Sequence, residues 1–120
     1  MASELTVKIA SDAWVKEANS YMNLDQQFKT FFPDDCFIAR GTGRENQHLL
    51  AERGIRLEYQ GVGDVVQCFM ELRSGGQFRP SNRGAIKAFY KATGAKVGDD
   101  ISFIKVTERA YKVVLAKTSA

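Results

Sequence analysis

The sequence contains few of the residues from which catalytic and metal sites are usually built. Its 120 residues include one histidine, two cysteines and two prolines. A metal site needs several His, Cys or carboxylate ligands at suitable spacing, and the sequence shows no such cluster. The lone histidine, His48, is followed by two leucines, a context more typical of a surface or core residue than of a catalytic base. The composition therefore argues against a catalytic or metal site, and no cofactor is expected.

Two further absences bear on where the protein works. Cys36 and Cys68 lie far apart and form no CxxC pair, which predicts two buried free thiols in a reducing compartment. No apolar run approaches membrane-spanning length, and Met1-Ala2-Ser3-Glu4 lacks the charged and apolar regions of a signal peptide. We therefore expect an intracellular protein without a membrane partner, in the nucleus if its host is eukaryotic and in the cytoplasm if it is bacterial. The net charge of +3 is only a weak indication of an anionic partner.

The apolar pattern predicts a fold in which strands predominate. An apolar content of 44% and 120 residues are enough for a single domain, residues 1–120, with one sizeable core. Apolar runs and alternations predict about seven short strands, at residues 5–10, 21–24, 36–39, 55–59, 65–73, 101–106 and 111–115. Helices are predicted at residues 25–32 and 83–93, and the tail Lys117–Ala120 is expected to be frayed. The predicted fold class is mainly β (α+β): a seven-stranded open barrel with two short helices at its ends.

The local signals are clearest around the second helix. Ser81 or Asn82 can cap it, because either side chain can accept a hydrogen bond from a first-turn N–H. Ile86, Phe89 and the tyrosine that follows recur at helical spacing, so they share one apolar face. Gly94 can supply the left-handed residue that ends the helix. A turn at residues 97–100 and an apolar strand come next.

Two loop segments combine basic, amide and aromatic side chains. The first runs from Ser11 to Asn23, and the second lies within Met70–Gly84. Their arginines can contact phosphates or pair with guanine, and their amides can read base edges. The glycines of Ser74-Gly75-Gly76 allow the backbone to approach a groove closely. These features favour a DNA surface, although a solvated hairpin with scattered charges explains the composition equally well.

The order of elements resembles the DNA-binding pseudobarrel superfamily, which includes plant B3 domains and DNA-recognition domains of type II restriction endonucleases. The matching stretches are Leu5–Asp12, Asn19–Phe28 with Phe31-Phe32-Pro33, Arg83–Phe89, and Val97-Gly98-Asp99 with Ile101-Ser102-Phe103. In the last two, an aromatic helix residue precedes a Gly-Asp turn and an apolar strand. Plant members often carry Gly-Trp at the helix start, where this chain has Gly84-Ala85. The resemblance therefore extends to the fold more than to the plant subfamily.

The resemblance implies sequence-specific binding of double-stranded DNA through two arms in the major groove. Carried onto this chain, the amino-side arm spans Ser11–Asn23 and the carboxy-side arm spans Glu71–Asn82. The candidate base readers are Asn19, Tyr21, Asn23, Arg73, Gln77 and Arg79. The candidate phosphate contacts are Lys8, Ser11, Lys16, Ser81, Asn82 and Arg83.

We therefore expect a non-catalytic DNA-binding domain, either of a transcription factor or as the targeting domain of a restriction endonuclease. The chain looks too short, and too poor in clustered acidic or histidine residues, to carry a nuclease centre as well. Two alternatives from other classes stay open. One is a small β-barrel that binds a protein or peptide, and the other is an enzyme that uses His48.

Overall fold

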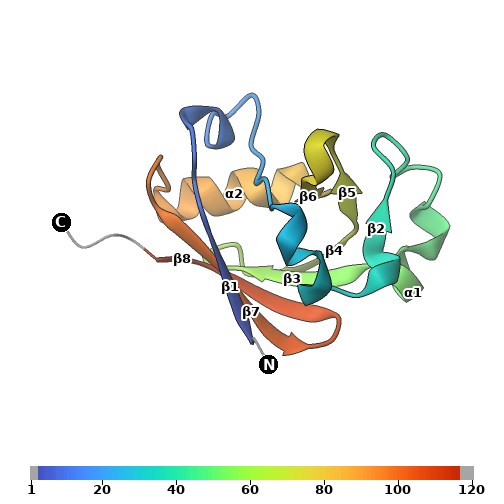
Figure 1. The fold of residues 1–120 in the computed structure, drawn as a ribbon. Coiled ribbons are helices and arrows are strands. Elements are labelled where there is room, and N and C mark those ends of the chain that lie inside the picture. The colour runs from blue at the N-terminus through green and yellow to red at the C-terminus, as the bar shows by residue number, and fades with distance from the viewer. Residues whose placement is uncertain (1–2, 117–120) are drawn as a thin grey trace.

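The structure, a computed structural model, describes residues 3–116, so the predicted tail Lys117–Ala120 lies outside the described residues. Over this range, eight strands form two open sheets rather than a closed barrel (Figure 1). The strands are β1 (Glu4–Lys8), β2 (Phe37–Ile38), β3 (Ile55–Tyr59), β4 (Val65–Cys68), β5 (Met70–Leu72), β6 (Phe78–Pro80), β7 (Asp100–Thr107) and β8 (Ala110–Ala116). The helices are α1 (Leu50–Arg53), α2 (Arg83–Thr93) and the 3₁₀ turns η1 (Asp12–Trp14), η2 (Gln26–Phe31), η3 (Asp34–Cys36), η4 (Gln47–Leu49) and η5 (Ser74–Gly76). The predicted fold class, a mainly β open architecture with short helices, is confirmed.

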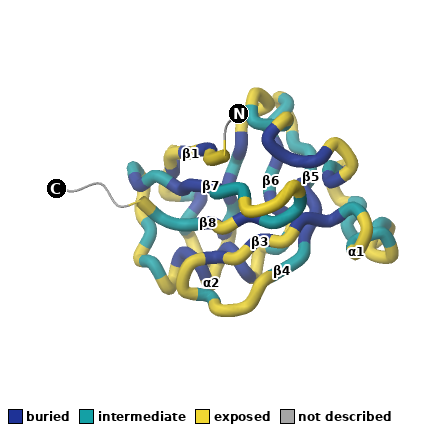
Figure 2. Tube along the Cα trace, turned by 90° about the horizontal axis from the view of Figure 1, so that it is seen from below, coloured by how far each residue is buried: buried dark blue, intermediate teal, exposed yellow. Residues whose placement is uncertain are grey.

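The larger sheet has the strand order β1-β7-β8-β3-β4, which can be followed from below in Figure 2. Its centre is the predicted antiparallel hairpin of β7 and β8, in which Phe103 lies opposite Val113. Strand β3 pairs in parallel with β8 and antiparallel with β4. Along β3, Ile55, Leu57 and Tyr59 are buried while the residues between them are exposed. This alternation places the core on the face of the sheet that α2 covers.

The smaller sheet, β2-β5-β6, arises where the chain leaves the larger one at Phe69. The sequence predicts one strand over residues 65–73, but β4 pairs with β3 whereas β5 pairs with β2 and β6. Between them, the Phe69 N–H donates to Ser81 Oγ at 3.0 Å, and the Phe69 carbonyl accepts from the Ser81 N–H at 2.9 Å. An apolar pattern indicates that a strand is buried but not which sheet it joins. The division of residues 65–73 between two sheets therefore could not be predicted from the local sequence.

Two other differences cancel in the strand count, so the division of residues 65–73 into β4 and β5 gives eight strands rather than seven. Strand β6 was not predicted, because three residues that include Pro80 give no alternating pattern. Residues 21–24, predicted to be extended, contribute a single bridge between Leu24 and Phe78. That bridge joins the residue that follows the amino-side arm to the carboxy-side arm.

Both predicted helices are present, whereas α1 and the turns η1, η3, η4 and η5 were not predicted. The predicted helix at residues 25–32 is the short 3₁₀ helix η2, which buries Phe31. Helix α2 has the predicted bounds, Asn82 Oδ1 accepts from the Ala85 N–H at 3.1 Å as its cap, and Gly94 ends it at φ 67°. No helix in the described part of the chain is both long and apolar enough to span a bilayer.

Aromatic side chains connect the two sheets. The Phe32 ring lies 5.8 Å from Phe78 of β6, 5.9 Å from Phe103 of β7 and 5.0 Å from Tyr111 of β8, measured between centroids. All four rings are buried, and such contacts stabilise a core beyond simple area burial. The smaller sheet, which carries the carboxy-side arm, is therefore held firmly against the larger one. Cys36 and Cys68 are both buried free thiols, as predicted.

Candidate nucleic-acid interface

The amino-side arm is an ordered loop anchored by a buried tryptophan. Trp14 is 5% exposed, and its carbonyl accepts from the Tyr21 N–H at 3.1 Å. Between them, Ser20 has φ 45°, a left-handed conformation that is uncommon for serine. Its buried hydroxyl lies 3.4 Å from the carbonyls of Lys16 and Glu17, contacts that hold the turn. The arm is thus shaped by its own backbone before any partner binds.

Helix α2 also holds this arm. The Arg83 guanidinium donates to the Asn19 carbonyl at 2.7 and 3.0 Å and to the Ala18 carbonyl at 2.8 Å. About two turns further along the helix, the Tyr90 hydroxyl donates to the Tyr21 carbonyl at 2.7 Å. Arg83 stays a predicted phosphate contact, and in this structure its guanidinium also organises the amino-side arm.

The carboxy-side arm is the hairpin of β5 and β6, which turns through η5. The backbone N–H of Arg73 donates to the Gln77 carbonyl at 2.8 Å. Gly75 at the tip has φ 73°, a conformation that favours glycine. Leu24 and Phe78 exchange two backbone hydrogen bonds of 2.9 and 3.0 Å, so the hairpin is fixed to the end of the amino-side arm. Figure 1 shows the blue amino-side arm and the yellow η5 tip on the same side of the molecule.

A cleft of about 210 Å³ lies between the arms. Its lining residues are Asn19, Tyr21, Arg73, Arg79 and Arg83, all of them predicted site residues. Residues from both arms and from the start of α2 therefore meet at one place, although they are distant in the sequence. The chemistry of this lining, three guanidinium groups with one amide and one aromatic ring, suits an anionic and hydrogen-bonding partner.

The arginines of the cleft have different surroundings. Arg79 Nε donates to Asn23 Oδ1 at 2.6 Å, and its Cζ lies 3.9 Å from the centroid of the Tyr21 ring. Arg73 Nη2 is paired with Glu71 Oε1 at 2.7 Å, and the Arg73 Nε is buried without a partner. Arg79 is thus held by neutral groups, whereas Arg73 is partly neutralised.

Positive charge accumulates around Arg79. Partial burial, followed by the neighbouring charges of Arg73 and Arg40, lowers the pKa of the Arg79 guanidinium, while Tyr21 and Glu71 oppose that change. Arg40 was not among the predicted residues, because the sequence places it in a loop outside both arms. It lies two residues beyond β2, which is paired with β5, and this pairing brings it near the arms. No local signal in the sequence indicates that neighbourhood.

The remaining predicted residues lie beside this cleft or on the arms. Lys8, Asn23 and Gln77 border a neighbouring cleft, where Lys8 pairs with Asp100 at 3.2 Å. Ser11 and Lys16 are exposed on the amino-side arm. Within residues 3–116, no three His, Cys, Asp or Glu side chains gather at metal-binding spacing, and His48 lies exposed on η4.

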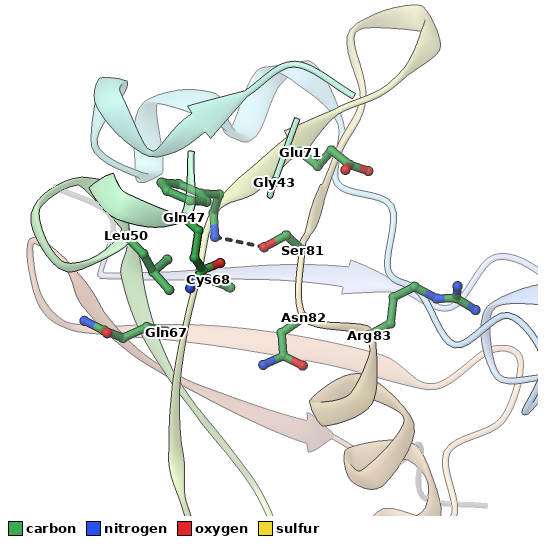
Figure 3. Close-up of a pocket in the computed structure, with 10 residues that line it drawn as sticks. Gly43, Gln47, Leu50, Gln67, Cys68, Glu71, Ser81, Asn82 and Arg83 are labelled. Carbon is green, nitrogen blue, oxygen red and sulfur yellow. Dashed lines mark hydrogen bonds between the residues drawn. The ribbon is translucent and has the colours of Figure 1, made fainter. Parts of the chain in front are cut away.

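Ser81, Asn82 and Arg83 line a third cleft at the start of α2 (Figure 3). In that view the Ser81 hydroxyl takes part in the bond from the Phe69 N–H, and the Arg83 side chain extends away from the other lining residues. Ser81 and Asn82 therefore have structural roles, besides the phosphate contacts predicted for them.

Asn82 allows the two roles to be separated. We expect Asn82→Ala to lower the free energy of unfolding by about 1 kcal/mol, the usual cost of losing a helix cap. Asn82→Asp keeps a good cap and should retain the stability, but its negative charge should weaken binding to the DNA duplex that the family resemblance implies. Chemical denaturation and a duplex-binding titration of both variants test this. Equal DNA affinity of Asn82→Asp and the wild type would show that Asn82 lies away from the phosphates.

Comparison with known proteins supports the fold. No protein-family model matches the sequence, and no curated protein matches it. Among solved structures, the hypothetical Arabidopsis thaliana protein At1g16640.1 is similar, with TM-score 0.55 and 15% identity over 99% of this chain and 98% of that chain. The N-terminal domain of Helicobacter pylori LlaJI.R1 gives TM-score 0.42 and 10% identity over 82% of this chain and 87% of that chain. The first likeness concerns the fold alone.

Proposed function

We propose that this chain is a non-catalytic, sequence-specific double-stranded DNA-binding domain whose two arms enter the major groove. The observation that carries the proposal is the cleft between the arms, in which Arg73, Arg79 and Arg83 converge. Arg40 adds a further positive charge nearby, and Glu71 is the carboxylate that pairs within the cluster. A DNA duplex offers both the phosphates and the base-edge acceptors that such a cluster binds.

The arrangement of the arms supports groove binding in particular. Both arms project from one side of the molecule, and the glycine-containing η5 tip allows close approach of the backbone (Figure 1). The hydrogen bonds from Arg83 and between Leu24 and Phe78 fix the arms relative to each other. Arms that are ordered before binding lose less conformational entropy when they meet a duplex. The domain would serve as the DNA-recognition part of a transcription factor or of a restriction endonuclease.

An electrophoretic mobility shift on random duplex DNA at two salt concentrations tests the proposal. We expect a shifted complex that weakens strongly as salt rises, because phosphate contacts release counterions. Repeated selection of the bound duplexes should then converge on a preferred sequence. The absence of a complex at low salt would contradict DNA binding, and that result would favour the alternative of a protein- or peptide-binding module. Binding without any preferred sequence would contradict the specific part of the proposal.

Lys16 is the predicted phosphate contact most easily tested, because its side chain is exposed on the amino-side arm. We expect Lys16→Ala to weaken binding to all duplexes alike and to lower the log–log salt slope by about one unit. Lys112 provides a matched control, because it is an exposed lysine on β8 of the larger sheet, outside both arms. Lys112→Ala should leave the affinity and the slope unchanged. A change in base preference in Lys16→Ala would mean that this lysine contacts bases.

A further inference from the structure

The Arg79 side chain is held in one orientation by two residues of the opposite arm. Asn23 Oδ1 accepts from Arg79 Nε at 2.6 Å, and the Tyr21 ring lies under the guanidinium with its centroid 3.9 Å from Cζ. The hydrogen bond fixes the Nε edge of the group, and the ring fixes its plane. Arg79 and Asn23 are 56 positions apart in the chain, so this arrangement exists only in the folded protein.

The residues that hold Arg79 are themselves fixed by the backbone. The hydrogen bonds between Leu24 and Phe78 lock the strand positions next to Asn23 and Arg79. Both backbone polar groups of Tyr21 are hydrogen-bonded, since its N–H donates to the Trp14 carbonyl and its own carbonyl accepts from the Tyr90 hydroxyl at 2.7 Å. The orientation of Arg79 is therefore set by half-buried residues whose backbone is anchored to the rest of the fold.

Arg79 lines the cleft, and within residues 3–116 its two terminal nitrogens form no hydrogen bond with the protein. Among the hydrogen bonds of residues 3–116, neither Nη1 nor Nη2 of Arg79 donates to a protein acceptor, and neither is buried. Arg73, the other arginine of the hairpin, differs because Glu71 pairs with its Nη2 and its Nε is buried. Of the two arginines, Arg79 is thus the one whose terminal N–H groups form an open, oriented fork.

We propose that Tyr21 and Asn23 form a clamp that presents the terminal N–H groups of Arg79 to one guanine in the major groove. Guanine has two neighbouring acceptors there, O6 and N7, which match the fork, whereas adenine places a donor beside N7. Tyr21 and Asn23 then act as positioning residues and do not read bases themselves, although the sequence nominated both as readers. This inference rests on the proposed function and names the base that the same site recognises.

The wild-type protein and a modified duplex provide the first test. Once selection has defined the preferred duplex, each guanine is replaced singly by 7-deazaguanine, which lacks the N7 acceptor, or by inosine, which lacks only the minor-groove amino group. We expect one position at which 7-deazaguanine weakens binding about five- to a hundredfold, while inosine leaves it unchanged. A preferred duplex without any guanine of this behaviour would overturn the proposal while leaving DNA binding intact. A wild-type protein that binds no duplex would overturn the proposed function and this inference together.

The clamp is tested by variants that keep or remove one contact. Arg79→Lys keeps the charge but removes the fork, Tyr21→Leu removes the ring, Asn23→Ala removes the acceptor, and Tyr21→Phe is the control that keeps the ring. We expect the first three to reduce the preference at the same guanine by threefold or more, and Tyr21→Phe to retain it. Thermal denaturation identifies any variant that fails to fold, and Asn23→Ala tests the clamp independently of the Tyr21 variants.

Two results would overturn the clamp. In the first, Tyr21→Leu and Asn23→Ala retain the guanine preference that Arg79→Lys loses. In the second, Asn23→Ala changes the preference at a different base pair from Arg79→Lys, which would make Asn23 a reader itself.

Discussion

Replacing Phe89 with alanine should lower the free energy of unfolding by about 3–5 kcal/mol, the usual range for emptying a large buried aromatic site. Phe89 is fully buried on α2, and its ring lies 5.4 Å from that of Tyr59 on β3 and 5.7 Å from that of Tyr90. The cavity cannot easily close, because helix and sheet are both fixed by their own hydrogen bonds. Urea denaturation of the variant and the wild type gives the difference directly.

Lys91 supplies a matched control for this measurement. It lies two residues further along α2 on the exposed face, so Lys91→Ala should change the stability by less than about 0.5 kcal/mol. A loss below about 1 kcal/mol in Phe89→Ala would contradict the packing of α2 against β3.

Replacing Arg83 with alanine should weaken DNA binding about tenfold or more, because hydrogen bonds from a charged donor contribute more than neutral ones. The Arg83 guanidinium donates to the carbonyls of Ala18 and Asn19, so its loss should loosen the whole amino-side arm. We therefore expect faster hydrogen exchange at the amides of residues 19–22 in the free protein. This second measurement needs no DNA and tests the structural role by itself.

Two further variants separate arm ordering from simple phosphate contact. Arg83→Lys keeps the charge but cannot reach two carbonyls with a planar fork, so we expect it to recover little of the affinity. Lys87→Ala is the control. Within the described residues, Lys87 reaches the same arm through an exposed ion pair with Glu17 at 3.2 Å, a kind of contact that contributes little. Wild-type affinity in Arg83→Lys, or unchanged exchange in Arg83→Ala, would show that Arg83 serves only as a charge.

Much of the candidate site was predictable as a set of residues but not as an arrangement. Five predicted residues do line one cleft, because loop composition and the family resemblance pointed to the same two segments. Their individual roles depend on contacts across the fold. Arg83 donates to the Asn19 carbonyl, although the two residues are 64 positions apart in the sequence. Arg40 lies near Arg79 because β2 pairs with β5. Side-chain composition carries no information about such partners.

Local chemistry determined the elements whose interactions close within a few residues. Helix α2 begins at its Asn82 cap, buries Ile86 and Phe89 at helical spacing and ends at Gly94, all of which follow from neighbouring residues. The β7–β8 hairpin likewise follows from two apolar runs joined by a short turn.

Only the tertiary structure decided how these elements are joined. The chain changes sheets at Phe69 because Ser81, twelve residues later, satisfies its backbone N–H and carbonyl. Strand β3 pairs in parallel with β8, and Phe78 bonds to Leu24. The sequence around each of these residues does not indicate its partner. A hydrogen bond across the fold depends on which distant segments the packed core brings together. The orientation of Arg79 between Tyr21 and Asn23 is decided in the same way, by packing rather than by local sequence.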